Sequence, residues 1–156
     1  MDVYNIIKHN ADKGGFNVNI KPYIHHVQYY ETDKMGVVHH SNFVRWMEEA
    51  RVYMMAEAGF GYGRLEKEGI ISPVIGVKCD YKIMAQFEDD ILIETDIKEY
   101  NGIKLVIEYV MKNSVTEKIV AKGQSSHCFL NSSGRPVNLK KVCPELDKAF
   151  NLLMEK

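Results

Sequence analysis

The 156-residue chain has few cysteines, no excess of either charge and no long apolar run, and each absence narrows what the protein can be. Its three cysteines are widely spaced and form no Cys-x-x-Cys pair, which predicts free thiols in a reducing cytoplasm without disulfides or a zinc knuckle. A formal net charge of −1 gives no indication of a nucleic-acid partner. No apolar stretch approaches the roughly 18 residues of a membrane-spanning helix, and the N-terminus lacks a signal-peptide pattern. A cytoplasmic globular protein remains.

The length allows one domain with a proper core and is too short for two ordinary ones. Residues 1–20 are interpreted as an N-terminal appendage, because Gly14-Gly15 interrupts the chain after a short helical pattern. Residues 21–156 are then expected to form a single domain.

The first half of this domain predicts one strand followed by one long helix. β-branched and aromatic residues dominate residues 23–30 and favour a strand. An apolar stripe at helical spacing follows, and Gly59 stands where that helix would end. The stripe consists of Phe43, Trp46, Met47, Ala50, Met54 and Ala58.

The second half predicts four strands and a closing helix. The strands are expected at residues 74–81, 91–100, 104–115 and 118–131, separated by turn-forming residues. Asn101-Gly102 predicts a type I′ hairpin turn, because both residues tolerate positive φ. The closing helix is expected at residues 144–153, with Pro144 in its first turn. One long helix can cover one face of a curled five-stranded antiparallel sheet, so the predicted class is α+β.

The most informative stretch lies between the first strand and the long helix. Asp33 ends the β-rich run, a short Gly-bearing loop follows, and the polar cluster His40, Ser41 and Asn42 opens the helix. This order sets a carboxylate close to a helix N-terminus, where backbone N–H groups and the helix dipole stabilise an oxygen that gains negative charge. Hydrolysis of an activated acyl group needs these two components.

Residues 29–51 resemble the signature of hotdog-fold acyl-CoA thioesterases, since they read Tyr-Tyr-x-Thr-Asp-x-x-Gly-Val-Val-x-His-x-Asn-Phe and then Glu-x-Ala-Arg. The branch they resemble most is the 4-hydroxybenzoyl-CoA thioesterase type, which includes short-chain enzymes linked to the Tol–Pal system. The resemblance spans about residues 23–150. It implies a hotdog fold, and homodimers joined edge to edge, often paired into a homotetramer, with active sites at the dimer interface. It also implies an acyl-CoA substrate and no cofactor, with acyl carrier protein thioesters as an open alternative.

Carried over position by position, the resemblance assigns roles to the motif. Asp33 matches the catalytic aspartate, either as nucleophile or as general base through a water. Gly36 and Val37 match the loop whose backbone N–H groups polarise the thioester carbonyl. His40 matches a histidine that orients the substrate or the loop. The remaining matches, beside the site, are Tyr29 and Asn42.

The chain also departs from the family pattern. The family commonly carries a further acid before the Thr-Asp pair, whereas here Glu31 stands alone, and Met84 occupies a position where many relatives have proline. Both changes leave the acyl-chain preference open. Flexible methionine side chains around the motif favour an adaptable pocket, and those considered are Met35, Met47, Met54, Met55 and Met84.

Three further groups of residues allow other interpretations. The pairs His25-His26 and His39-His40 suggest a metal, but no carboxylate or cysteine completes a ligand spacing, so no metal site is expected. Glu48 is a rival carboxylate, although its spacing from Arg51 fits an i,i+3 ion pair better. By charge alone, several basic residues are candidates for the CoA phosphates: Lys78, Lys82, Lys98, Lys104 and Arg135.

Two other functions compete with thioester hydrolysis. Hotdog hydratases and dehydratases use an Asp and a His for proton transfer at carbon, but their Asp-x-Asn-x-x-His motif is absent here. A non-enzymatic acyl-CoA sensor would share the fold but would not need Asp33, and no DNA-binding segment is recognisable. Acyl-CoA thioesterase is therefore the leading interpretation.

Overall fold

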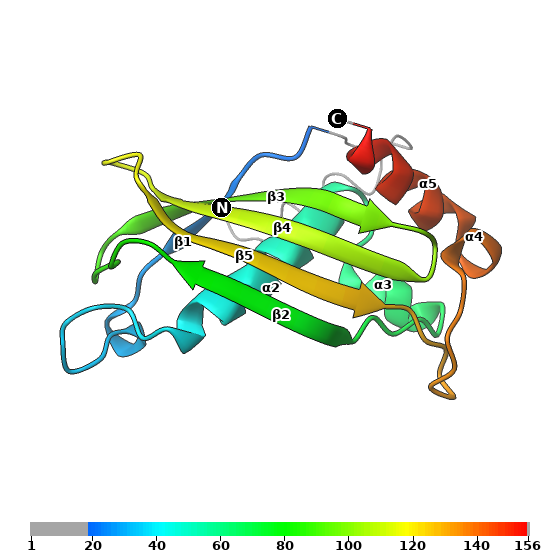
Figure 1. The fold of residues 1–156 in the computed structure, drawn as a ribbon. Helices are drawn as coiled ribbons and strands as arrows, with labels where there is room; N and C mark the ends of the chain where they lie inside the picture. The colour runs from blue at the N-terminus through cyan, green and yellow to red at the C-terminus, as the bar shows by residue number, and fades with distance from the viewer. Residues whose placement is uncertain (1–18, 156) are drawn as a thin grey trace.

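A computed structural model describes residues 19–155 and shows an antiparallel sheet with one long helix against one face (Figure 1). The predicted appendage lies outside the described residues except for its last two positions. The five strands take the order β1-β3-β4-β5-β2, and every neighbouring pair is antiparallel. Their bounds are β1 Tyr23–His26, β2 Val74–Tyr81, β3 Asp90–Tyr100, β4 Lys104–Asn113 and β5 Ile119–Cys128. The predicted α+β class is confirmed.

Helix α2, Ser41–Glu57, crosses the concave side of the sheet and supplies much of the core (Figure 1). The predicted apolar stripe is confirmed, because all six of its residues are buried. Met47 lies so close to β5 that a Cβ on Gly123 would collide with its sulfur, so a larger residue at Gly123 would force the Met47 side chain to move. The helix ends at Glu57, and the expected stop residue Gly59 follows its cap with a φ of +92°, which favours glycine.

The segment after β1 differs from the sequence prediction. The strand ends at His26, and Tyr29–Glu31 form a 3₁₀ turn, η1, instead of continuing to Tyr30. The buried Glu31 carboxylate accepts a 2.8 Å hydrogen bond from the Gln28 N–H and closes the turn. Tertiary burial of one carboxylate therefore overrides the local strand propensity.

The β3–β4 hairpin is present, but its turn is not the predicted type I′. Gly102 has a φ of +88°, whereas Asn101 does not have positive φ. The Asn101 side-chain oxygen accepts hydrogen bonds from the N–H groups of Ile103 and Lys104, at 3.0 and 2.8 Å. The connection is therefore a three-residue loop organised by the asparagine side chain.

The remaining helices are short and lie toward the other end of the sheet from the loop before α2 (Figure 1). They are α3 Tyr62–Lys67, α4 Leu139–Val142 and α5 Pro144–Met154. Helix α5 confirms the predicted closing helix with Pro144 at its start, and it packs Phe150 against Tyr100 of β3 and Phe129.

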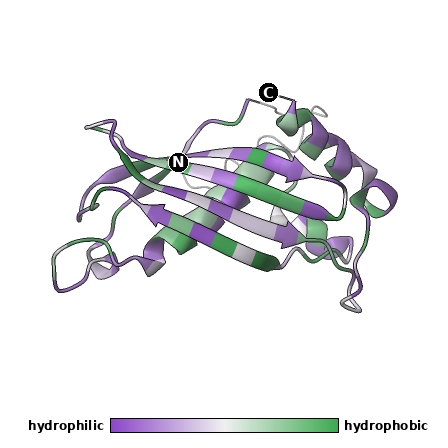
Figure 2. Ribbon diagram, in the orientation of Figure 1, coloured by the Kyte–Doolittle hydropathy of each residue, from purple (hydrophilic) through white to green (hydrophobic). Residues whose placement is uncertain are grey.

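Strands β1 and β2 form the two edges of the sheet, and hydrophobic residues extend onto the edge strand β2 (Figure 2). Strand β2 is one of these edges, and Val74, Ile75 and Val77 are each about half exposed on it. Within residues 19–155, no helix combines the length and apolarity required to cross a bilayer.

Candidate active site

The loop between η1 and α2 is tightly organised around Asp33. The Asp33 N–H donates to the Val37 carbonyl oxygen at 2.9 Å, and the Gly36 N–H donates to the Asp33 carbonyl oxygen at 3.0 Å. One carboxylate oxygen of Asp33 accepts from the Met35 N–H at 2.8 Å, and Gly36 has a φ of +74°. The turn thus depends on glycine geometry at Gly36 and fixes the direction of the Asp33 side chain.

Asp33 lies at the wall of a pocket of about 320 Å³, a volume within the usual range for small-molecule sites. Most side chains around it are apolar. The lining residues are Asp33, Met35, Val37, Val38, His40, Phe43, Tyr81, Lys82, Ile83, Met84 and Ala85. The pocket therefore combines a carboxylate and a histidine with a largely apolar surface, as hydrolysis of an acyl ester of a hydrophobic acid would require.

The opposite wall comes from residues 81–85, which begin with the last residue of β2. The Tyr81 hydroxyl donates to the His40 carbonyl oxygen at 3.1 Å, and the Val38 N–H donates to the Ala85 carbonyl oxygen at 2.8 Å. The Tyr81 ring meets Phe43 edge-on, with centroids 5.2 Å apart. Of this wall, only Lys82 and Met84 are singled out from the sequence. The contact between residues 81–85 and the loop that carries Asp33 joins segments far apart in the chain, so no local pattern predicts it.

The other residues predicted for the site lie in different surroundings. His40 is exposed, with its ring 4.2 Å from that of His39. Tyr29 is 76% exposed, meets Phe87 edge-on and is not among the pocket-lining residues. Asn42 is buried, and its amide donates to the Glu31 carbonyl oxygen at 2.8 Å, so it connects α2 to the turn.

The N-terminus of α2 adjoins the pocket through His40. Two N–H groups of its first turn are already engaged: Asn42 donates to the His39 carbonyl oxygen at 3.0 Å and Ser41 to the His39 ring at 3.4 Å. In the loop, the Gly36 N–H is engaged by Asp33, whereas no hydrogen bond from the Val37 N–H is found among residues 19–155. Val37 is thus the available backbone donor of the two that the sequence proposed.

The histidine pairs have carboxylate or hydroxyl partners. His25 lies between Glu31 and Glu49, His26 bonds Asp90 at 2.7 Å, and His39 bonds Ser41. In the described part of the chain, no three His, Cys, Asp or Glu residues are grouped as metal ligands would be.

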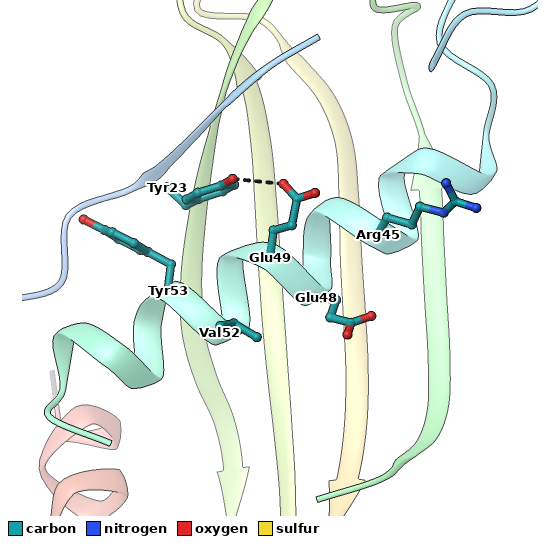
Figure 3. A pocket seen from close by; sticks show the side chains of 6 residues that line it. All are labelled: Tyr23, Arg45, Glu48, Glu49, Val52 and Tyr53. Atoms are coloured by element: carbon teal, nitrogen blue, oxygen red, sulfur yellow. Dashed lines mark hydrogen bonds between the residues drawn. The ribbon is translucent and has the colours of Figure 1, made fainter. Parts of the chain in front are cut away.

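A second depression, of about 350 Å³, lies on the outer face of α2 and does not include Asp33 (Figure 3). Its lining residues are Tyr23, Arg45, Glu48, Glu49, Val52 and Tyr53. Figure 3 shows Tyr23 of β1 and Glu49 pointing toward each other, joined by a 2.9 Å hydrogen bond. Glu48, the rival carboxylate, belongs to this outer depression and not to the Asp33 pocket.

Not all of the methionines considered from the sequence reach the pocket. Met35 and Met84 line it and are 75% and 70% exposed, whereas Met47, Met54 and Met55 are buried in the core under α2. Of these five methionines, two therefore contribute flexible side chains to the pocket.

Comparison with known proteins agrees with this architecture. Residues 27–150 match the model of the thioesterase-like superfamily. The chain is 36% identical over 125 residues to YneP of Bacillus subtilis (strain 168), named provisionally as an acyl-CoA thioesterase, with 80% of this chain and 90% of that protein covered. It is 27% identical over 103 residues to the acyl-CoA thioesterase YbgC of Haemophilus influenzae, covering 65% of this chain and 72% of the relative.

Among solved structures, a DHNA-CoA thioesterase from Staphylococcus aureus superposes with a TM-score of 0.82 at 27% identity. The superposition covers 86% of this chain and 91% of that one. The curled five-stranded sheet with α2 on its concave side is therefore the hotdog fold, as the motif predicted. The chain belongs to the thioesterase-like superfamily.

Proposed function

We propose that this protein is an acyl-CoA thioesterase that hydrolyses an acyl-CoA to the free acid and CoA in the Asp33 pocket. The observation that carries the proposal is the meeting of Asp33, His40 and an apolar lining around one pocket of about 320 Å³. The names of the relatives support the same chemistry, since YneP and YbgC are named as acyl-CoA thioesterases. The reaction as proposed needs neither a metal nor a cofactor.

Asp33 acts in one of two ways on the thioester carbonyl carbon. As a nucleophile, its carboxylate forms a mixed anhydride that water then hydrolyses; as a general base, it takes a proton from the attacking water. In both routes the carbon–sulfur bond breaks and CoA leaves as the thiolate. The half-buried position of Asp33 at the pocket wall is compatible with either route.

The developing negative charge on the carbonyl oxygen is stabilised by backbone dipoles. The unengaged N–H of Val37 is the first donor, and the positive end of the α2 dipole adds a favourable field. The turn conformation of Gly36 shapes this loop, while His40, Tyr29 and Asn42 position the substrate or the loop from the flanks.

The active unit is a homodimer or a homotetramer. Strand β2 leaves one edge of the sheet open and carries half-exposed apolar side chains, which a second copy would cover by continuing the sheet. Light scattering should give two or four times the 17.9 kDa chain mass. A monomer at micromolar concentration contradicts this assembly.

Val77→Asp on β2 should weaken the dimer, because it places a charge on the edge strand that a second copy would cover. Ile24→Asp, exposed on β1 at the opposite edge, should not weaken it.

The test of the function is a panel of acyl-CoAs and acyl carrier protein thioesters, read by release of free thiol. Asp33→Asn should lower kcat by about 10² to 10⁴ while fold and assembly stay intact. Asp90→Asn, an exposed aspartate bonded to His26, is the matched control and should keep wild-type turnover. An Asp33→Asn enzyme with more than half of the wild-type kcat contradicts the proposal. Loss of enoyl absorbance without thiol release would instead indicate a hydratase, and binding without turnover a sensor.

A further inference from the structure

Glu31, the acid that stands alone before the Thr-Asp pair, is only 5% exposed and lies two positions before Asp33. One of its carboxylate oxygens accepts from the Gln28 N–H at 2.8 Å and from His25 Nε2 at 2.9 Å. The other accepts from Trp46 Nε1 at 2.8 Å. Three donors thus satisfy this buried carboxylate, and two of them come from other elements, β1 and α2.

The backbone of Glu31 connects the same point to the start of α2. Its carbonyl oxygen accepts from the Asn42 side-chain amide and from the His39 N–H, both at 2.8 Å. The loop that carries Asp33 begins and ends at residues tied to Glu31. A displacement of Glu31 would therefore also displace Asp33, because only Thr32 separates the two residues.

His25 lies between two carboxylates. Its Nε2 is 2.9 Å from Glu31 and its Nδ1 is 2.9 Å from Glu49, while its ring lies tilted against that of Trp46 with centroids 4.5 Å apart. An ionised carboxylate only accepts hydrogen bonds, so both ring nitrogens can donate only when the imidazole is protonated. The geometry therefore fits a cationic His25.

Within residues 19–155, two carboxylates face His25. Glu31 faces it from η1 and Glu49 from α2, and Tyr23 of β1 donates to the same Glu49 oxygen (Figure 3). From β3, its register partner is Ile91, which carries no charge. Burial acts to lower the pKa of His25, but the hydrogen bonds to Glu49 and Glu31 outweigh it and raise that pKa above its ordinary value.

We infer that the hydrogen-bonded pair of protonated His25 and Glu31, here called the His25–Glu31 clasp, positions Asp33 for catalysis, so that loss of the His25 proton lowers turnover. His25 and Glu31 are positioning residues, since neither lines the Asp33 pocket. The inference rests on the proposed role of Asp33. It adds a protonation requirement to the reaction that lies outside the pocket.

Deprotonation turns one donor of His25 into a lone pair that faces a carboxylate oxygen. The buried Glu31 then loses a donor or is repelled, and the turn that leads to Asp33 shifts. A displacement of about 1 Å at a reacting group can cost about 10²-fold in rate. The facing wall of residues 81–85 lies elsewhere in the chain and stays in place, so the change should fall more on kcat than on KM.

The sign of the pH effect follows from the raised pKa of His25. The clasp is intact below about pH 6.5, the pKa of a histidine in the unfolded chain. It is lost as pH rises through the higher pKa that His25 has in the folded protein. Wild-type kcat should therefore fall on the alkaline side, with a midpoint equal to the His25 pKa read by NMR of histidine-labelled protein.

The test compares kcat and KM between pH 5.5 and 9.5 for wild type, His25→Gln and His26→Gln, each in its native assembly. His25→Gln should lower kcat at pH 7 by about 10- to 100-fold with KM changed less than about threefold, and should lose the alkaline decline. His26→Gln is the matched control, since this neighbour bonds Asp90 in an exposed pair outside the loop, and should behave as wild type. An alkaline decline that persists in His25→Gln overturns the inference.

Glu49→Gln provides a second test, should His25→Gln fail to fold. The Glu49 side chain is 43% exposed, and its replacement keeps an acceptor for His25 while removing one negative charge. The alkaline decline should move to lower pH; an unmoved midpoint contradicts the clasp. Asp33→Asn in the same series separates the two ideas, because its full activity would contradict the proposed function, whereas an inactive Asp33→Asn with an unmoved Glu49→Gln midpoint contradicts only the clasp.

Discussion

The hydroxyl of Tyr81, at the end of β2, donates a hydrogen bond to the carbonyl oxygen of His40, the residue before α2, at 3.1 Å. This bond joins the two walls of the Asp33 pocket. The edge-on contact of Tyr81 with Phe43 adds an apolar contact between the same two walls.

Tyr81→Phe should therefore have a small effect and Tyr81→Ala a larger one. The phenylalanine keeps the ring contact and loses one exposed hydrogen bond, which should cost less than about 1 kcal/mol of unfolding free energy and about two- to fivefold in kcat/KM. The alanine also opens the wall, so kcat/KM should fall by more than about tenfold. Equal values for the two variants would show that the ring does not shape the pocket.

Much of this fold could be predicted because its signals are local. Strand β2 was predicted with the bounds that the structure has, and the apolar stripe of α2 was buried as expected, since both follow from short-range periodicity. The strand predicted over residues 23–30 is present only as Tyr23–His26, because contacts of Glu31 with Trp46 and His25, which form only when the chain folds, hold the turn that follows. No local pattern carries that information.

The candidate site was also predictable only where its residues lie close together in the sequence. Asp33, Val37 and His40 are close in sequence and line one pocket. The facing wall of residues 81–85 depends on the Val38–Ala85 hydrogen bond and on the sheet edge at β2, which are long-range. For the same reason, no local pattern distinguishes Met84, at the pocket, from Met54 in the core.

Lys82 is the one basic candidate that lines the pocket, whereas Lys78 pairs with Asp80 at 3.3 Å. If Lys82 contacts a CoA phosphate, Lys82→Met should raise KM for an acyl-CoA by about three- to tenfold, the size of one partly exposed charge-assisted contact, with kcat unchanged. The same acyl group on N-acetylcysteamine, which has no phosphate, should show no change. Lys78→Met is the matched control. A KM increase on both thioesters would show that Lys82 acts on the acyl group or the fold instead.

His127 predicts a pH-dependent stability that is separate from catalysis. Burial, and to a lesser extent the charge of Arg51, lowers the pKa of His127 to about 4, and its Nε2 bonds Ser125 at 2.7 Å. The unfolded chain, with an ordinary histidine pKa near 6.5, binds more protons between these values, so stability is present above pH 6.5 and is lost as pH falls toward 4.

Urea unfolding at pH 7 and pH 5 measures this effect. Relative to His127→Gln, which cannot titrate, the wild type should lose about 2 kcal/mol of unfolding free energy between the two pH values. The comparison with the variant removes the contribution of His25, whose stabilisation changes in the opposite direction. A difference that is the same at both pH values would contradict a neutral buried His127.

The final prediction concerns the acyl chain. Met35 and Met84 are flexible, largely exposed side chains on facing walls of the pocket, and its other apolar lining includes Val37, Ile83 and Ala85. Such a lining should accept a spread of short to medium aliphatic acyl-CoAs, and aromatic ones with modest discrimination. Each added methylene contributes about 0.8 kcal/mol in an apolar pocket, so neighbouring chain lengths should differ by about tenfold at most in kcat/KM.

Met84→Phe should lower kcat/KM most for the longest acyl chains, because the larger ring fills part of the pocket. Met154→Phe, outside the pocket, should leave the series unchanged. One acyl group preferred by three decades over its neighbours would show a rigid, dedicated site and contradict this reading.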